Sequence, residues 1–199
     1  MATSTHQQQL TAKGEATRAR IVAATADHIL GAGIGGTSLD DVRAATTTSK
    51  SQLFHYFPGG KAELVRAVVA FQAQRVHDAQ QPALAALDTV ESWEDWARAI
   101  LAHYRAQPRF GCPIGSLSAE AAATDAQLAH EVEAYMRDWR LQLQAGLERL
   151  GAREPERVAA AIFATLQGGL LLTRTEQAIW PLEAALDGIL TQVRAAIAS

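Results

Sequence analysis

The sequence predicts an all-α fold of about nine helices, and three features carry that prediction. Apolar residues recur at three- and four-residue spacing through most of the chain after about residue 15, which is the period of a helix with one buried face. No segment shows the sustained alternation of apolar and polar residues that marks a half-buried strand. Glycine and proline clusters interrupt the helical pattern where helices would end. With 199 residues and 48% hydrophobic content, the chain can bury a sizeable core.

The first predicted helix carries its apolar residues on one face between residues 21 and 30 and stops at the glycine cluster in 31–36. Ser38 and Asp41 then have the spacing of a capping box, in which each side chain bonds to the backbone N–H of the other residue. The box predicts that a short helix starts here and runs to about Thr46.

A second short helix is predicted from Ser49 to about Phe57. Hydroxyl residues at 46–49 separate it from the first, because such side chains compete for backbone hydrogen bonds and favour helix caps over helix interiors. The sequence Pro-Gly-Gly at 58–60 ends it. Two short helices joined by a tight turn are the helix-turn-helix geometry, so we divide the chain into a flexible arm (1–14), a DNA-binding head (15–60) and a body (61–199).

The body shows the helical period most clearly. A long helix is predicted from Lys61 to about residue 81, and Ser92 is placed to cap the next one. A break follows at 108–115, and an unbroken apolar stripe then runs from 128 to 150. Two more helices are predicted, and their apolar positions fall at Val158, Ile162, Leu166 and Leu170 in the first and at Leu182, Leu186, Ile189, Val193 and Ile197 in the second.

The second short helix of the head has the residue types that read DNA. Leu53 and Phe57 lie four residues apart and can face inward, which leaves the polar side chains for the groove. Glutamine can pair with adenine, lysine can meet phosphate or guanine, and serine permits close approach. Lys61, at the start of the next helix, adds a cation beside N–H groups that favour phosphate. The candidate DNA-binding residues are Ser38, Thr48, Ser49, Lys50, Ser51, Gln52, His55, Tyr56 and Lys61.

The stretch from Gly36-Thr-Ser-Leu-Asp-Asp-Val to Ser-Lys-Ser-Gln-Leu-Phe-His-Tyr-Phe-Pro-Gly-Gly-Lys61 resembles the DNA-binding segment of TetR-type transcriptional repressors. With Gly111-Cys-Pro-Ile-Gly-Ser116 and Leu166-Gln-Gly-Gly-Leu170, it is similar to the LmrA/YxaF branch, whose members respond to small drug-like or flavonoid compounds. The resemblance implies a three-helix head and a body that binds an effector and dimerises. It also implies that Tyr56 contacts the DNA backbone, and we expect Phe54 to pack instead.

One residue departs from the family pattern. Members usually carry glycine in the turn where this chain has Thr47. If the turn requires a positive φ, a β-branched residue is strained there. The departure bears on the geometry of the turn and on the placement of Thr48 and Lys50.

The body is rich in large apolar residues beside the break at 108–115. Any one of them can simply fill the core, but together they suit an apolar cavity with few polar anchors, such as Gln167 or Thr175. The candidate effector-pocket residues are Trp96, Tyr104, Phe110, Cys112, Trp139, Leu143, Phe163, Gln167, Leu171 and Thr175.

Cys112 is the only cysteine, which excludes an intrachain disulfide and any multi-cysteine metal site. It suits a small buried residue, and the alternative is a thiol that senses oxidants or electrophiles, with Arg109 nearby to favour the thiolate. His103 and His130 lack the partners of a metal or catalytic site, and no nucleophile elbow or phosphate loop is present. We therefore expect neither enzyme activity, nor a metal, nor a cofactor.

The net charge of −3 is unevenly placed. Residues 1–61 hold six basic and four acidic side chains (+2), whereas residues 62–199 hold 12 arginines, no lysine and 17 acids (−5). A mildly basic head on an acidic body suits DNA as a partner of the head alone. The family resemblance implies that this DNA is a palindromic double-stranded operator. No apolar run approaches the length of a membrane span and the N-terminal sequence lacks a secretory signal, so we expect a cytoplasmic protein without a membrane partner.

The last two predicted helices carry small residues on one side, namely Ala159, Ala160, Gly168 and Gly169, and branched apolar residues on the other. A helix pair that is apolar on two faces needs a second surface, which the same pair of another subunit would supply. The sequence thus predicts a homodimeric repressor that a small hydrophobic effector releases from its operator. The alternative is a small-molecule or thiol-based sensor whose head no longer binds DNA.

Overall fold

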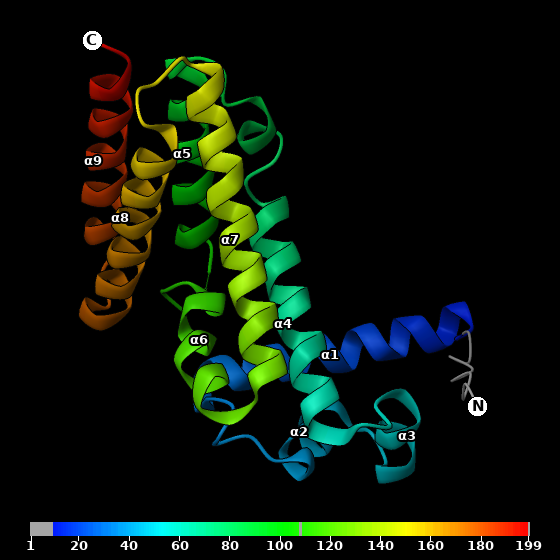
Figure 1. Ribbon diagram of the computed structural model, residues 1–199. Helices are drawn as coiled ribbons and strands as arrows, with labels where there is room; N and C mark the ends of the chain where they lie inside the picture. Colours follow the sequence, from blue (N-terminus) through cyan, green and yellow to red (C-terminus); the bar gives the residue numbers. More distant parts are fainter. Residues whose placement is uncertain (1–9, 108, 199) are drawn as a thin grey trace. The chain divides into compact units, whose positions relative to one another are not determined.

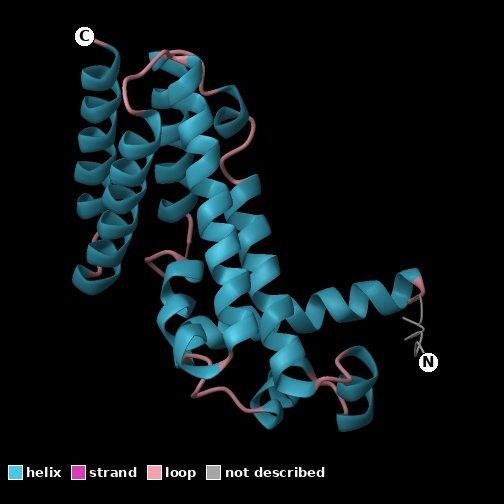
Figure 2. Cartoon of the chain, in the orientation of Figure 1, coloured by secondary structure: helices cyan, strands magenta, loops and turns pink. Residues whose placement is uncertain are grey.

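The computed structural model describes residues 10–107 and 109–198, and in that part of the chain it contains nine α-helices, one short 3-10 helix and no strand (Figure 1). Figure 2 shows that the helices are joined by short loops. The all-α prediction is confirmed. The helices are α1 (Ala12–Ala32), α2 (Leu39–Thr46), α3 (Lys50–Tyr56), α4 (Gly60–Asp78), η1 (Ala83–Ala86), α5 (Val90–Arg105), α6 (Pro113–Thr124), α7 (Ala126–Arg149), α8 (Pro155–Glu176) and α9 (Trp180–Ile197).

The first compact unit contains α1, α2, α3 and the first part of α4. Its helix α1 begins at Ala12, because the Thr11 side chain accepts a hydrogen bond from the N–H of Gly14 and so caps the helix. Residues 12–14, which the sequence assigned to the flexible arm, are therefore helical. Residues 1–9 of that predicted arm lie outside the described residues.

The first unit ends at Phe71, ten residues beyond the predicted start of the body at Lys61. The reason lies in α4, whose side chains at Leu64, Val65 and Val68 are buried. The apolar face of the helix thus belongs to the core of the head for its first turns, and a boundary placed at the preceding proline turn misses this. The core of the unit is made by Ile21, Val22, Ile29, Val42, Leu53, Phe57, Leu64 and Val68, all of which are buried.

The second unit begins at Gln72 and holds η1 and α5 to α9. Its core includes two tryptophans, Trp93 and Trp96, whose rings meet edge to face at 5.7 Å. Helices α8 and α9 lie side by side (Figure 1), and they approach closely at Gly169, where an added Cβ would lie 2.4 Å from the Cβ of Ala185. A glycine is needed at that point because no side chain fits between the two backbones.

Two helix starts in the body differ from the predictions. Thr89, not Ser92, caps α5, and Ser92 is the third residue of the helix, where it completes the capping box. Helix α6 begins within the predicted break, with Cys112 as its N-cap and Pro113 at the first helical position. Proline suits that position because its missing N–H would have no partner there.

Helix α8 has a mean hydropathy of 1.3 over an 18-residue window, and among the described helices it is long and apolar enough to cross a membrane by length and composition. In the sequence, Gln167, Gly168 and Gly169 interrupt its apolar residues, so no single apolar run reaches that length. A third of the window (33%) is buried within the chain. Its buried face includes Ile162, Leu166 and Leu170, as expected of a helix that packs against helical neighbours on one side.

Candidate nucleic-acid interface and effector pocket

Helix α3 is a seven-residue helix that a complete capping box starts. The Ser49 hydroxyl accepts from the N–H of Gln52 at 3.1 Å, and Gln52 Oε1 accepts from the N–H of Ser49 at 3.0 Å. The box satisfies two backbone donors that a helix start otherwise leaves without partners. The capping box also uses the side-chain oxygen Oε1 of Gln52 as an acceptor. The NH₂ group is therefore the part of that side chain that is left to face a base.

Helix α3 has a buried face and an exposed face, and the two residues predicted to face inward lie on the buried one. Leu53 and Phe57 are buried, and the Arg18 guanidinium lies 4.9 Å from the Phe57 ring centroid. Tyr56 is half-buried and meets the His55 ring edge to face at 5.0 Å. The candidate residues that lie exposed at this helix are Ser49, Lys50, Ser51, Gln52 and His55.

Phe54, which we expected to pack and not to contact DNA, has a side chain that is 40% exposed. Successive residues are rotated by about 100° around a helix, so a residue that follows the buried Leu53 points away from the core. An exposed aromatic ring beside the polar residues of α3 extends the exposed face of the helix.

The turn between α2 and α3 contains the left-handed residue that the family pattern suggested. Thr47 has φ 52° and ψ 41°, and the N–H of Thr48 bonds to the carbonyl of Arg43 at 3.1 Å. Thr48 itself is 5% exposed, and its hydroxyl donates to the carbonyl of Thr46 at 3.3 Å. Thr48 was a candidate DNA contact, but its side chain is buried and bonds to the backbone of the turn, so it is not available at the surface.

The remaining candidates of the head flank α3. Ser38 is exposed and caps α2, with Asp41 Oδ2 accepting from both its N–H (2.8 Å) and its hydroxyl (2.6 Å). These bonds hold the pKa of Asp41 below its usual value. Lys61 lies in the first turn of α4 and is partly exposed. Lys50 at the start of α3 and Lys61 at the start of α4 thus place two ammonium groups on this part of the head.

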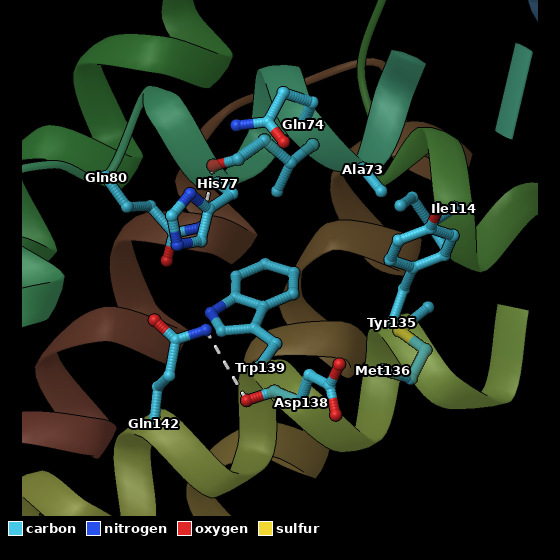
Figure 3. Close-up of a pocket in the computed structure, with 11 residues that line it drawn as sticks. Ala73, Gln74, His77, Gln80, Ile114, Tyr135, Met136, Asp138, Trp139 and Gln142 are labelled. Carbon is cyan, nitrogen blue, oxygen red and sulfur yellow. Dashed lines mark hydrogen bonds between the residues drawn. The ribbon is translucent and has the colours of Figure 1, made fainter. Parts of the chain in front are cut away.

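The second unit contains a cavity of about 280 Å³ between α4 and α7 (Figure 3). The Trp139 indole, the Tyr135 ring and Ile114 supply its apolar surface, and the amides of Gln74 and Gln142 supply polar atoms. The residues that line it are Ala73, Gln74, Val76, His77, Gln80, Ile114, Tyr135, Met136, Asp138, Trp139 and Gln142.

A larger cavity, of about 730 Å³, lies beside it at α6, α7 and α8; we call it the α6–α8 cavity. Met136 lines both cavities, and the rings of Trp139 and Phe163, one from each lining, meet edge to face at 5.3 Å. The residues that line the α6–α8 cavity are Gly111, Cys112, Gly115, Ser116, Ser118, Met136, Phe163, Gln167, Leu170, Leu171, Arg174 and Thr175.

Cys112 lies where α6 begins, and its Sγ accepts from the N–H of Gly115 at 3.3 Å. Burial raises the pKa of the thiol, more than the backbone N–H groups of Gly115 and Ile114 lower it. A buried thiol with a raised pKa carries little thiolate at neutral pH, so the reactive form of the cysteine is disfavoured.

The head and the body each match a known family. Residues 21–68 match the bacterial regulatory proteins of the tetR family, and residues 86–187 match the C-terminal domain of LmrA/YxaF-like transcriptional regulators. The second match alone covers more than half of the chain. The chain is a TetR-family transcriptional regulator of the LmrA/YxaF-like type.

Full-length relatives agree with this assignment. The regulator is 28% identical over 178 residues to an HTH-type transcriptional regulator from the lacX 3′ region of Lactococcus lactis subsp. lactis, with 86% of this chain and 90% of the relative covered. It is 24% identical over 157 residues to the HTH-type transcriptional regulator LmrA of Bacillus subtilis, with 75% and 82% covered. A TetR transcriptional regulator from Chloroflexus aurantiacus has the same fold, with a TM-score of 0.77, 25% identity and 92% and 96% of the two chains covered.

The candidate pocket residues of the regulator divide into two groups. Six line one of the two cavities, namely Trp139 in the smaller and Cys112, Phe163, Gln167, Leu171 and Thr175 in the α6–α8 cavity. Trp96, Tyr104 and Leu143 are corrected, since each is buried in the core and lines neither cavity. Phe110 is half-buried beside the loop before α6 and also lines neither. The core needs these large residues for packing, which sequence spacing cannot distinguish from a pocket wall.

Sequence reasoning missed Arg174 and Ser116, which the structure joins across the rim of the α6–α8 cavity by a hydrogen bond from the guanidinium to the hydroxyl. The two residues lie 58 positions apart in the chain. No local pattern links them, although the Gly-Cys-Pro-Ile-Gly-Ser motif did mark the segment that holds Ser116.

Proposed function

We propose that this regulator is a homodimeric repressor that binds a palindromic operator through α3 and leaves it when a small hydrophobic effector occupies the body. The observation that carries the proposal is the form of α3 in a family of DNA-binding regulators. Its core face is anchored by Leu53 and Phe57, its start is capped by Ser49, and its exposed face bears Lys50 and Gln52 without an acidic residue.

Each exposed residue of α3 has a distinct proposed role. Lys50, with Lys61 of α4, meets phosphates, and such contacts position a protein without reading sequence. The amide NH₂ of Gln52 donates to a base edge in the major groove, and Ser38, Ser49, Ser51, His55 and Tyr56 approach the groove and its walls. Because the net charge is −3, non-specific attraction is weak, so affinity depends on a dimer fitted to one site.

The proposed effector site lies in the body, where two adjoining cavities share the side chain of Met136. An apolar ligand that fits one separation of the two heads better than another shifts the population toward that separation. A separation that misses adjacent major grooves releases the operator. A thermal-shift screen of small apolar compounds identifies such ligands.

Dimerisation through α8 and α9 is supported by large apolar side chains that lie exposed in the described part of the chain. Leu172 is 49% exposed and Trp180 is 56% exposed. An added Cβ at Gly168 or Gly188 would meet nothing within 4 Å, which distinguishes Gly168 from Gly169, whose place is between α8 and α9. The sequence suggested that the small residues of α8 share one side of the helix. They do not, because Ala159 and Gly169 are buried and Ala160 is exposed.

The variant Gly168→Leu tests the dimer. In a single chain the substitution adds helix propensity and meets no neighbour, so the helix gains stability. In a dimer through this face the larger side chain pushes the subunits apart. We expect sedimentation equilibrium to give a dimer mass for the wild type and a largely monomeric Gly168→Leu. A dimer of unchanged affinity in this variant would place the interface elsewhere.

The DNA-binding proposal is tested by fluorescence anisotropy with a fragment from upstream of the regulator's own coding sequence. Lys50→Ala and Lys61→Ala should weaken binding to all fragments and each lower the slope of log affinity against log salt by about 1. Gln52→Ala should relax preference at one base position. Unchanged binding in all three variants would remove the assignment of this surface.

The second candidate function is a sensor whose head has lost DNA binding, and the strained Thr47 is the observation that favours it. The hydrogen bonds of the turn count against it, because they form despite the left-handed residue. The thiol-based form of this candidate is further disfavoured by the raised pKa of Cys112. Specific binding of the upstream fragment by the wild type, together with slow alkylation of Cys112 in the folded protein, would reject it.

A further inference from the structure

Arg174 is the one charged side chain among the described residues that line the α6–α8 cavity. Several arginines of the body are paired with acids, for example Arg105 with Glu183 and Arg194 with Glu94. Arg174 forms no ion pair with an acidic side chain in the described part of the chain. The cavity therefore carries a cation whose charge the protein itself does not neutralise.

The Arg174 side chain is held at the rim of this cavity by two neighbours. Its guanidinium donates to the Ser116 hydroxyl, which in turn donates to the carbonyl of Cys112 at 2.8 Å. Its aliphatic stem passes over Gly111, where an added Cβ would lie 3.1 Å from both Cβ and Cδ of Arg174. Gly111 has φ 104°, so glycine suits both its conformation and the space. The bond to Ser116 uses one of the several N–H donors of a guanidinium and leaves others for a ligand.

The rest of the cavity supplies an apolar surface. Met136, Phe163, Leu170 and Leu171 line it, and Leu171 is 64% exposed. The Nε2 of Gln167, a further lining residue, is buried and has no hydrogen-bond partner in the described part of the chain. The cavity thus places a guanidinium and several apolar side chains around one space, which is the arrangement that an amphipathic ligand requires.

Charge decides which amphipathic ligand fits. A cationic ligand would be repelled by Arg174, and a neutral ligand would leave its charge unused. An anion gains charge-assisted hydrogen bonds, and a carboxylate matches the planar fork of the guanidinium with two parallel bonds. The first turn of α6 lies at the same rim and adds the partial positive charge of a helix N-terminus. The smaller cavity differs, because Asp138 lines it and no lysine or arginine is among its described lining residues.

We propose that the α6–α8 cavity binds a monocarboxylic acid with an apolar tail. Its carboxylate pairs with the Arg174 guanidinium, and its tail lies on Met136, Phe163 and Leu170. That this acid acts as the effector rests on the proposed function, whereas its binding does not.

The test compares decanoate with 1-decanol, which differ in the charged head and share the length of the tail. Each is titrated by isothermal calorimetry into the full chain without DNA, as wild type, Arg174→Gln, Arg174→Lys and Arg153→Gln. Arg153→Gln is the matched control, because it removes the same charge from an exposed position just before the start of α8, about 30 Å from Arg174 along the helix axis. Circular dichroism establishes that each variant is folded.

We expect the wild type and Arg153→Gln to bind decanoate at least about tenfold more tightly than decanol. Arg174→Gln should bind the two probes equally, and Arg174→Lys should keep part of the preference, because it retains the charge and loses the fork. Equal binding of both probes by the wild type, a preference that survives in Arg174→Gln, or no binding of decanoate up to its solubility limit would overturn the proposal.

The same proteins separate this proposal from the proposed function. If the regulator fails to bind its upstream DNA but shows the Arg174-dependent preference, the repressor proposal fails and the carboxylate site stands. If it binds the DNA and shows no preference, the carboxylate site alone fails.

Discussion

The Arg20 guanidinium donates a hydrogen bond to the backbone carbonyl of Thr46 at 2.5 Å, which ties α1 to the last residue of α2. The next residue, Thr47, takes the left-handed conformation that turns the chain toward α3. A β-branched residue is unfavourable there, and the bond from Arg20 is one of the contacts that hold the turn in place. The position of α3 thus depends on tertiary contacts at the point where the local sequence is least suited to the turn.

Replacement of Thr47 by glycine should stabilise the regulator. An L-residue with a side chain costs about 1–2 kcal/mol in the left-handed region, and glycine avoids that cost while it loses some entropy on folding. We expect Thr47→Gly to raise the free energy of unfolding by about 0.5–1 kcal/mol in urea titrations. Ala44→Gly, at an exposed position inside α2, is the control and should lower it by about the same amount. A loss of stability in both variants would contradict the strain at Thr47.

A buried hydrogen bond in the body should distinguish two neighbouring tryptophans. Trp96 Nε1 donates to Gln80 Oε1 at 2.8 Å, whereas Trp93 Nε1 has no partner in the described part of the chain. Trp96→Phe and Trp93→Phe remove the same volume, but only the first leaves a buried carbonyl without its donor. We expect Trp96→Phe to be about 1–2 kcal/mol more destabilising than Trp93→Phe in chemical denaturation. Equal losses would mean that the bond adds nothing to stability.

His103 should make the regulator less stable in mild acid. Burial, and then the charge of Arg75, lower the pKa of His103 below its usual value of 6.5. Near pH 6.5 the unfolded chain therefore binds a proton at this histidine, whereas the folded chain does not. The free energy of unfolding consequently falls as the pH drops from just above 6.5 toward the lowered pKa. His103→Gln should flatten this part of the profile measured by denaturation at several pH values. His130→Gln, at an exposed position, is the control, and an equal flattening by it would contradict the role of His103.

The head could be predicted largely from its sequence because its determinants are local. The pairs Ser38–Asp41 and Ser49–Gln52 lie three residues apart, and the anchors Leu53 and Phe57 lie four apart, so each can be found within one or two helical turns. The partial exposure of Phe54 follows from its angular position beside the buried Leu53, which residue type alone does not indicate.

The body was less predictable because its cavities join segments that are distant in the chain. Arg174 bonds to Ser116 across 58 residues, and the buried Trp96 donates a hydrogen bond to Gln80, 16 residues earlier. An aromatic residue on an apolar face can fill a core or line a pocket, and the difference depends on which helix lies opposite. Helix α6 lay partly inside a predicted break, since the proline that suggested the break occupies the first position of the helix.

The most direct test of the central claim is the affinity of Gln52→Glu for the upstream DNA fragment, measured by fluorescence anisotropy beside the wild type. Glutamate keeps the acceptor that the capping box uses at Ser49 and suits a helix start, so the free energy of unfolding should be unchanged or slightly higher. It removes the NH₂ donor and places a negative charge toward the phosphates. If α3 reads the operator, Gln52→Glu binds at least about tenfold more weakly than the wild type. Equal affinity in a stably folded Gln52→Glu would contradict the claim.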